Sequence, residues 1–220
     1  MNIRMEDTIC AIATPVGEGG IGIVRVSGEK ALELTSELVR LRSGRSLLSV
    51  KSHTLYHADI IEQGGLQAGD PVMPPRPIDE ALVVVMRAPR SYTAEDVVEI
   101  HCHGGPLVLQ TLCDRLVRRG ARLAEPGEFT KRAFLNGRLD LTQAEAVLDV
   151  IRAKTASSLR IAQEQLRGTL SKEIDRMRDK LIHLLAHLEA AIDFTEEDIT
   201  FIHPDELIRE LQETRTELAR

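Results

Sequence analysis

Short apolar runs separated by glycine and proline make up the part of the chain before Pro126. Runs of four to eight such residues, bounded by turn-forming residues, are typical of β-strands. The continuous run ALVVVM at 81–86 predicts a strand buried on both faces. The stretch 64–77, rich in glycine and proline, predicts an exposed connection. The whole pattern predicts strands at 8–13, 21–26, 54–61, 81–86 and 97–102.

Apolar residues at helical spacing predict two helices in the same part of the chain. One helix is predicted over 31–41. The other begins at Pro106, because proline is tolerated where the first helical N–H has no partner within the helix. It is expected to end at Gly120. Its buried face is predicted to consist of Leu109, Leu112, Cys113 and Leu116.

Beyond Pro126 the pattern becomes helical, and no convincing strand follows Leu123. Thr142 is predicted to cap a helix, with Glu145 completing a capping box. A last helix is predicted from about Pro204 to the end of the chain. Apolar residues at steps of three and four favour an antiparallel helical bundle. They are Ala144, Val147, Leu148 and Ile151 in one stripe, and Ile174, Met177, Leu181, Leu184, Leu188 and Ala191 in another.

The fold class is therefore predicted to be α+β, with a mixed-sheet domain over 1–124 and an all-α domain over 125–220. The core must be aliphatic, because the chain has no Trp, two Tyr and four Phe. The net charge of −6 disfavours strong nucleic-acid binding by this chain alone, since such binding depends on Lys and Arg that neutralise phosphates. Three cysteines without a Cys-x-x-Cys pair indicate a reducing cytoplasm. No apolar stretch approaches the ~20 residues of a membrane helix.

Three local motifs suggest chemistry, and each has a simpler interpretation. The segment 17–22 satisfies G-x-G-x-x-G, but a strand follows it where a nucleotide site needs a helix. We expect a flexible loop there that lets backbone approach a ligand or a partner. His101 and His103 share one side of a strand, yet two ligands are too few for a metal site. His183 and His187 lack the adjacent Glu of a zinc protease, so solvated histidines are expected.

A phosphate-binding P-loop is absent from the sequence. The pattern G-x-x-x-x-G-K-[ST] does not occur, and the chain contains no Gly-Lys pair. This excludes GTP or ATP hydrolysis by a P-loop site within these residues. No catalytic residue and no metal site is predicted in this chain, although a Ser-His-Asp triad cannot be read from linear spacing and stays open.

Four blocks in fixed order carry a resemblance to a known family. They read DTICAIATPVGEGGIGIVRVSG, PRSYTAEDVVEIHCHGG, EPGEFTKRAFLNGRLDLTQAEAVLDVI and AAIDFTEED. Together they resemble the tRNA modification GTPases of the MnmE/TrmE family. The resemblance implies an N-terminal domain with a tetrahydrofolate-binding-like fold that dimerises, followed by a helical domain interrupted by a Ras-like G domain. We expect this chain to be the front part of such a protein, truncated before the G domain.

The resemblance also implies cofactors and partners. The intact protein is expected to modify the wobble uridine of certain tRNAs with an aminomethyl or carboxymethylaminomethyl group. It would act with a flavin-dependent partner of the MnmG/GidA family, and formyl- or methylene-tetrahydrofolate would supply the one-carbon unit. GTP, Mg²⁺ and K⁺ are expected only in the intact protein. A cytoplasmic homodimer is implied, without a membrane.

By motif match, the resemblance implies three folate-binding residues: Arg25 in GIVRVSG, Glu99 in AEDVVEIHCHGG and Arg138 in FLNGRLDLTQAEA. Related sequences often carry Lys at the position of Arg138, and Lys donates as a point charge where Arg offers a planar fork. A carboxylate such as Glu99 can accept two adjacent N–H donors of a pterin ring. Arg25 or Arg138 suits the anionic benzoyl-glutamate tail. The alternative for each is a surface ion pair.

Two other functions are compatible with parts of the sequence. A stand-alone folate-dependent one-carbon transferase would share the fold, but the GTPase-type blocks count against it. A non-catalytic helical scaffold would explain the helices from Thr142 onward, but it leaves Arg25 and Glu99 unexplained.

Overall fold

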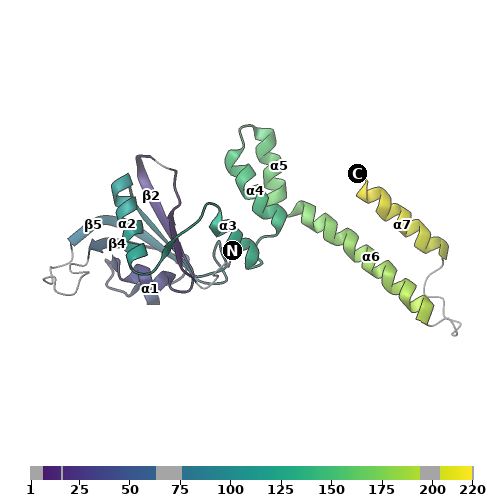
Figure 1. Ribbon diagram of the computed structural model, residues 1–220, viewed down its shortest axis with the longest axis horizontal. Helices are drawn as coiled ribbons and strands as arrows, with labels where there is room; N and C mark the ends of the chain where they lie inside the picture. The colour runs from purple at the N-terminus through teal and green to yellow at the C-terminus, as the bar shows by residue number, and fades with distance from the viewer. Residues whose placement is uncertain (1–6, 16, 63–75, 194–203, 220) are drawn as a thin grey trace. The chain divides into compact units, whose positions relative to one another are not determined.

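The computed structural model describes residues 7–15, 17–62, 76–193 and 204–219 (Figure 1). The chain divides into two units, Met1–Leu139 and Asp140–Arg220. The change of pattern at Pro126 lies inside the first unit, which includes helix α3 (Glu128–Leu135) with its buried residues Arg132 and Ala133. The stretch predicted as an exposed connection falls largely on 63–75, outside the described residues.

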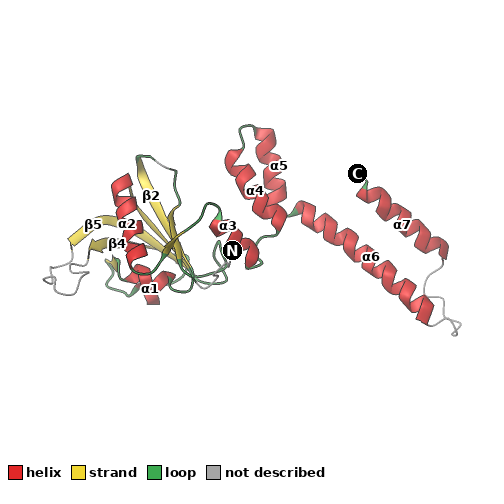
Figure 2. Ribbon diagram, in the orientation of Figure 1, coloured by secondary structure: helices red, strands yellow, loops and turns green. Residues whose placement is uncertain are grey.

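Seven strands form a single mixed sheet in the described part of the first unit, in the order β3-β4-β5-β6-β2-β1-β7 (Figure 2). Neighbouring strands are antiparallel except β1 and β7, which are parallel. The α+β class predicted from the sequence is therefore confirmed. The strands are β1 (Ile9–Ile12), β2 (Gly19–Ser27), β3 (Val39–Leu41), β4 (Leu55–Glu62), β5 (Arg76–Met86), β6 (Val97–Gly104) and β7 (Arg122–Leu123).

One face of the sheet is covered by α1 (Ala31–Ser36) and α2 (Pro106–Arg118), with a short 3₁₀ turn, η1 (Leu47–Ser49), beside them. As predicted, α2 has Pro106 in its first turn, and the chain leaves it at Gly120 with φ +108°. Its predicted apolar face is buried in a core built from aliphatic side chains and cysteines. That core includes Val24, Val26, Val83, Val85, Val98 and Ile100 from the central strands.

Three local predictions for this unit were wrong. The helix expected over 31–41 ends at Ser36, and β3 follows it, because Val39 and Leu41 are buried with Arg40 exposed between them. The apolar run of β5 is buried on one face only, and Leu82 on the other face is 44% exposed. The glycine-rich segment is not a free loop, since β2 begins at Gly19 and pairs with β6 across a register shift.

The second unit consists of helices over its described residues. They are α4 (Leu141–Arg152), α5 (Ala156–Leu166), α6 (Thr169–Asp193) and α7 (Pro204–Leu218). Helices α6 and α7 run antiparallel (Figure 1), and Lys180 of α6 pairs with Glu217 of α7 at 3.0 Å. Several apolar residues of the predicted stripes, such as Ile151 at 74% exposure, are exposed within this chain, whereas Leu184 is buried at 4%. No described helix meets the length and hydropathy needed to span a membrane.

The cap of α4 differs from the prediction. Asp140, not Thr142, is the N-cap, and its carboxylate accepts from the backbone N–H of Gln143 at 2.8 Å. The side-chain oxygen of Gln143 accepts in turn from the backbone N–H of Asp140 at 2.9 Å, which completes the capping box. Thr142 instead donates its hydroxyl to Asp140 at 2.7 Å. Asp and Thr both suit an N-cap, so pattern alone did not decide between positions two residues apart.

Candidate functional site

Arg25 and Glu99 form a direct pair on the sheet face opposite α1 and α2. They are register partners on β2 and β6, and their neighbours Val24, Val26 and Val98 point into the core instead. The Nε and an Nη atom of Arg25 both lie 2.7 Å from Oε1 of Glu99. The two side chains are 25% and 16% exposed, so both are partly desolvated yet reachable from solvent. Oε2 of Glu99 lies 3.3 Å from the imidazole Nε2 of His101.

Two aromatic rings flank the guanidinium of Arg25. Its Cζ lies 5.3 Å from the ring centroid of Tyr92 and 5.4 Å from that of Phe129. Arg138 reaches the same place, with its Cζ 5.0 Å from the Tyr92 centroid. A guanidinium at such distances is attracted by the negative face of the ring. The three residues expected to bind folate are therefore gathered around Tyr92, with Arg25 and Glu99 in contact and Arg138 on the shared ring.

Hydrogen bonds between distant segments hold Tyr92 in this position. Its hydroxyl lies 2.8 Å from Oγ1 of Thr130, in the first turn of α3. Asn136 donates its amide to the carbonyl of Thr93 at 2.7 Å. The hydroxyls of Ser27 and Thr93, both fully buried, are 2.7 Å apart. The segment before β6 is thus attached both to β2 and to α3.

A buried ionic cluster fixes α3 against the sheet. Arg132 is 3% exposed and donates to the Asp7 carbonyl at 2.8 Å, to Glu95 at 3.2 Å and to Glu128 at 3.3 Å. It also pairs with the Asp7 carboxylate. Arg122 adds bonds to Glu128 at 2.6 Å and to Asp7 at 2.7 Å. A buried guanidinium needs such partners, because an unpaired charge in the interior costs several kcal/mol.

The pKa values of the acidic groups follow from this pairing. The hydrogen bond from Arg122 lowers the pKa of Glu128 to about 2, against the opposing effect of burial. Burial raises the pKa of Asp7, but hydrogen bonds from Arg122 and Arg132 outweigh it and bring the pKa below its usual value. Both carboxylates are therefore ionised at neutral pH and complete the cluster.

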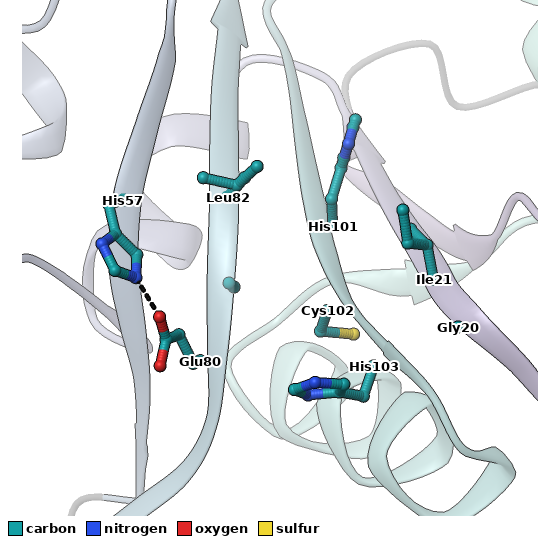
Figure 3. Close-up of a pocket in the computed structure, with 9 residues that line it drawn as sticks. Gly20, Ile21, His57, Glu80, Leu82, His101, Cys102 and His103 are labelled. Atoms are coloured by element: carbon teal, nitrogen blue, oxygen red, sulfur yellow. Dashed lines mark hydrogen bonds and ion pairs between the residues drawn. The ribbon is translucent and has the colours of Figure 1, made fainter.

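A depression of about 610 Å³ is lined by histidines and apolar side chains and includes His101, the neighbour of Glu99 (Figure 3). His101 and His103 both line it, as their spacing on one strand predicted. His57 is paired with Glu80, and His103 lies 2.6 Å from a carboxylate oxygen of Asp79. That hydrogen bond raises the pKa of His103. The described residues contain no cluster of three or more metal-ligating side chains.

The three cysteines belong to the core, and Cys102 also lines the depression. Cys10, Cys102 and Cys113 are free thiols buried in the core. Burial raises the pKa of Cys102 to about 11, so its thiol is protonated at neutral pH. A protonated, buried thiol is a poor nucleophile and a poor metal ligand.

Sequence reasoning did not identify Tyr92 and Phe129. Each belongs to a quoted block, but those blocks are far apart in the chain and nothing in either predicts contact with Arg25. The available signal was scarcity: in a chain with six aromatic rings besides its histidines, Tyr and Phe beside polar residues have an unusual role.

Two family models match consecutive parts of the chain, one over the sheet domain and one over the helices. Residues 8–138 match the family model described as GTP-binding protein TrmE N-terminus, and residues 141–220 match the MnmE helical domain. The chain therefore belongs to the MnmE/TrmE family of tRNA modification GTPases.

Curated relatives agree with this assignment. The chain is 49% identical over 216 residues to the tRNA modification GTPase MnmE of Carboxydothermus hydrogenoformans, covering 98% of this chain and 45% of the relative. It is 53% identical over 191 residues to the protein of the same name in Symbiobacterium thermophilum, covering 87% of this chain and 40% of the relative. The chain thus spans less than half the length of these relatives.

Proposed function

We propose that this chain is the folate-binding part of a tRNA modification GTPase and that its sheet domain binds formyl- or methylene-tetrahydrofolate. The observation that carries the proposal is the Arg25–Glu99 pair, which lies partly exposed between two aromatic rings. An acceptor, two cations and flat apolar surfaces suit a flat heterocycle with N–H donors and an anionic tail.

Each side chain has a distinct part in this proposal. The Glu99 carboxylate accepts from adjacent N–H donors of the pterin. Its Oε2 atom is available for this contact, because Arg25 bonds to Oε1. Arg25 and Arg138 attract the carboxylates of the tail. Bonds between ionised partners are about twice as strong as neutral ones, so these contacts contribute most where the site is partly desolvated.

For the whole protein we propose a cytoplasmic homodimer formed through the sheet domain. It would act with a flavin-dependent MnmG/GidA-type partner to place a (carboxymethyl)aminomethyl group on the wobble uridine of tRNA. The folate would supply the one-carbon unit. GTP, Mg²⁺ and K⁺ would bind to a part of the whole protein outside this chain, because this chain lacks a P-loop sequence. We therefore expect no GTP hydrolysis by the isolated chain.

Calorimetric titration with 5-formyltetrahydrofolate tests the proposal. The unchanged chain should bind saturably, and Arg25→Ala and Glu99→Ala should each weaken binding at least tenfold. Arg42→Ala is the matched control, because Arg42 forms a similar surface pair with Asp59 at 2.7 Å on β4. A folded chain that binds no folate, or equal losses in all three variants, would contradict the assignment.

Two further measurements separate the rival functions. One-carbon transfer by this chain without any partner would favour a stand-alone transferase. A folded chain that binds no folate but forms stable complexes through its helices would favour a scaffold. The partly exposed pair of Arg25 and Glu99 has no part in the scaffold function.

A further inference from the structure

Aromatic side chains are scarce in this protein, and their positions are therefore informative. The chain has two Tyr, four Phe and no Trp. The buried core of the sheet domain consists of aliphatic side chains and cysteines, and Tyr56 is the aromatic residue that packs partly against it among the described residues. Tyr92 and Phe129 are half-buried and lie against the guanidinium of Arg25 instead. Their rings are thus not needed to fill the core, and core packing does not explain why aromatic residues occupy these two positions.

A hydrogen bond positions the Tyr92 ring before any ligand arrives. The Tyr92 hydroxyl is bonded to Thr130, the residue after Phe129, so this bond joins the two segments that carry the rings. Two residues beyond Tyr92, Ala94 has φ +60°, a backbone conformation that is costly for a residue with a Cβ. The bond from Asn136 to the Thr93 carbonyl holds the segment in this conformation. A fixed ring loses little conformational entropy when a ligand packs on it.

The groups now lying on the Tyr92 ring are themselves flat. Arg25 and Arg138 both place a planar guanidinium within about 5 Å of its centroid. Arg138 is an exposed residue, and no ion pair holds its side chain within the described parts of the chain. A planar ring of a ligand can replace a guanidinium on an aromatic face without rearrangement of the backbone.

We propose that Tyr92 and Phe129 are ligand-binding residues, whose rings pack against the flat pyrimidine ring of the folate's pterin while Glu99 accepts from the edge of that ring. This inference rests on the proposed folate binding and adds the residues that recognise the heterocycle. The pterin replaces Arg138 on Tyr92, and the released guanidinium is then free to meet the anionic tail.

Titrations of single variants with 5-formyltetrahydrofolate test this inference. Tyr92→Leu and Phe129→Leu should each weaken binding about tenfold, the effect of losing one stacked ring. Tyr92→Phe keeps the ring and should bind within about threefold of the unchanged chain. Phe134→Leu is the control, because Phe134 lies on the same helix with 38% exposure and has no place in the site. Circular dichroism confirms that each variant is folded.

A second probe, a tetrahydropterin without the benzoyl-glutamate tail, separates ring contact from an indirect effect on the arginines. The two Leu variants should lose about the same factor for this probe as for the full ligand. If they lose affinity only for the full ligand, the rings act through the tail and the inference is overturned. If the unchanged chain binds and both folded Leu variants bind equally well, the inference fails while folate binding stands. If the unchanged, folded chain binds neither probe, both proposals fall.

Discussion

The guanidinium of Arg25 uses two of its nitrogens on a single oxygen of Glu99, at 2.7 Å each. This leaves the second carboxylate oxygen facing His101 at 3.3 Å, a distance longer than a strong hydrogen bond. The carboxylate is therefore held closely by Arg25 through one oxygen and only weakly contacted at the other. Such a group is suited to accept donors from a ligand without first losing a strong bond.

Glu99→Gln should separate binding from stability. The amide keeps the shape but loses the charge, so folate binding should fall about tenfold or more. The pair is partly exposed, and the free energy of unfolding should change by less than about 1 kcal/mol. Titration and urea unfolding measure the two effects. Asp59→Asn, which alters the Arg42 pair, should change neither by a comparable amount. An equal loss of stability and affinity would mean that Glu99 acts mainly in the fold.

Gly104→Ala should disturb the pairing of β2 with β6 at the edge of the site. A Cβ there would lie 2.5 Å from the carbonyl oxygen of Gly19 and 3.0 Å from that of Ile21, and backbone cannot easily yield. We expect a loss of about 1–3 kcal/mol in unfolding free energy.

Gly105→Ala provides the neighbouring control for this effect. The nearest atom to its added Cβ is a methyl of Val108 at 3.9 Å, so the cost should stay below about 1 kcal/mol. Urea unfolding followed by tyrosine fluorescence suits both variants, because Tyr56 and Tyr92 are the only Tyr residues and both lie in the sheet domain. Equal costs at the two positions would contradict the close approach of the strands.

The elements that local pattern determines were predictable from the sequence. The two ends of α2 were predicted from Pro106 and Gly120. Its buried face was predicted from the spacing of Leu109, Leu112 and Leu116. Prediction failed where packing decides the outcome. Val39 and Leu41 extend a helical pattern from α1, but pairing with β4 converts them into a strand. Leu82 belongs to an apolar run, but it is exposed because α1 and α2 cover only the other face.

The site was predictable only in part, for a physical reason. Arg25, Glu99 and Arg138 came from a resemblance in motifs, and direct pairing of Arg25 with Glu99 depends on the register of β2 and β6. Tyr92 reaches α3 through a bond that spans 38 residues. Contacts of that separation depend on tertiary packing, and local sequence carries no signal for them. The contacts of Tyr92 and Phe129 with Arg25 could therefore be recognised only in the folded structure.

Arg132→Met should be among the most damaging single changes in the sheet domain. It keeps much of the side-chain length but leaves Asp7, Glu95 and Glu128 without their shared cation. Removal of one partner from a buried ionic cluster costs about 3–5 kcal/mol. Arg42→Met is the control, since its pair is exposed and should cost less than about 1 kcal/mol. Similar midpoints for both variants in urea would show that the cluster is not stabilising.

The same cluster predicts how stability depends on acidity. The pKa of Glu128 is about 2 in the folded chain and near 4.5 when unfolded, so the unfolded state binds the proton first as pH falls. Its contribution is fully present above about pH 5 and is lost as pH drops towards 2. Glu128→Gln removes that contribution at every pH. The gap in unfolding free energy between the unchanged chain and this variant should therefore be largest at pH 7 and close to zero near pH 2. Glu37→Gln, at an exposed position of the same domain, should show only a small gap throughout, whereas a pH-independent gap for Glu128→Gln would rule out ionisation as its cause.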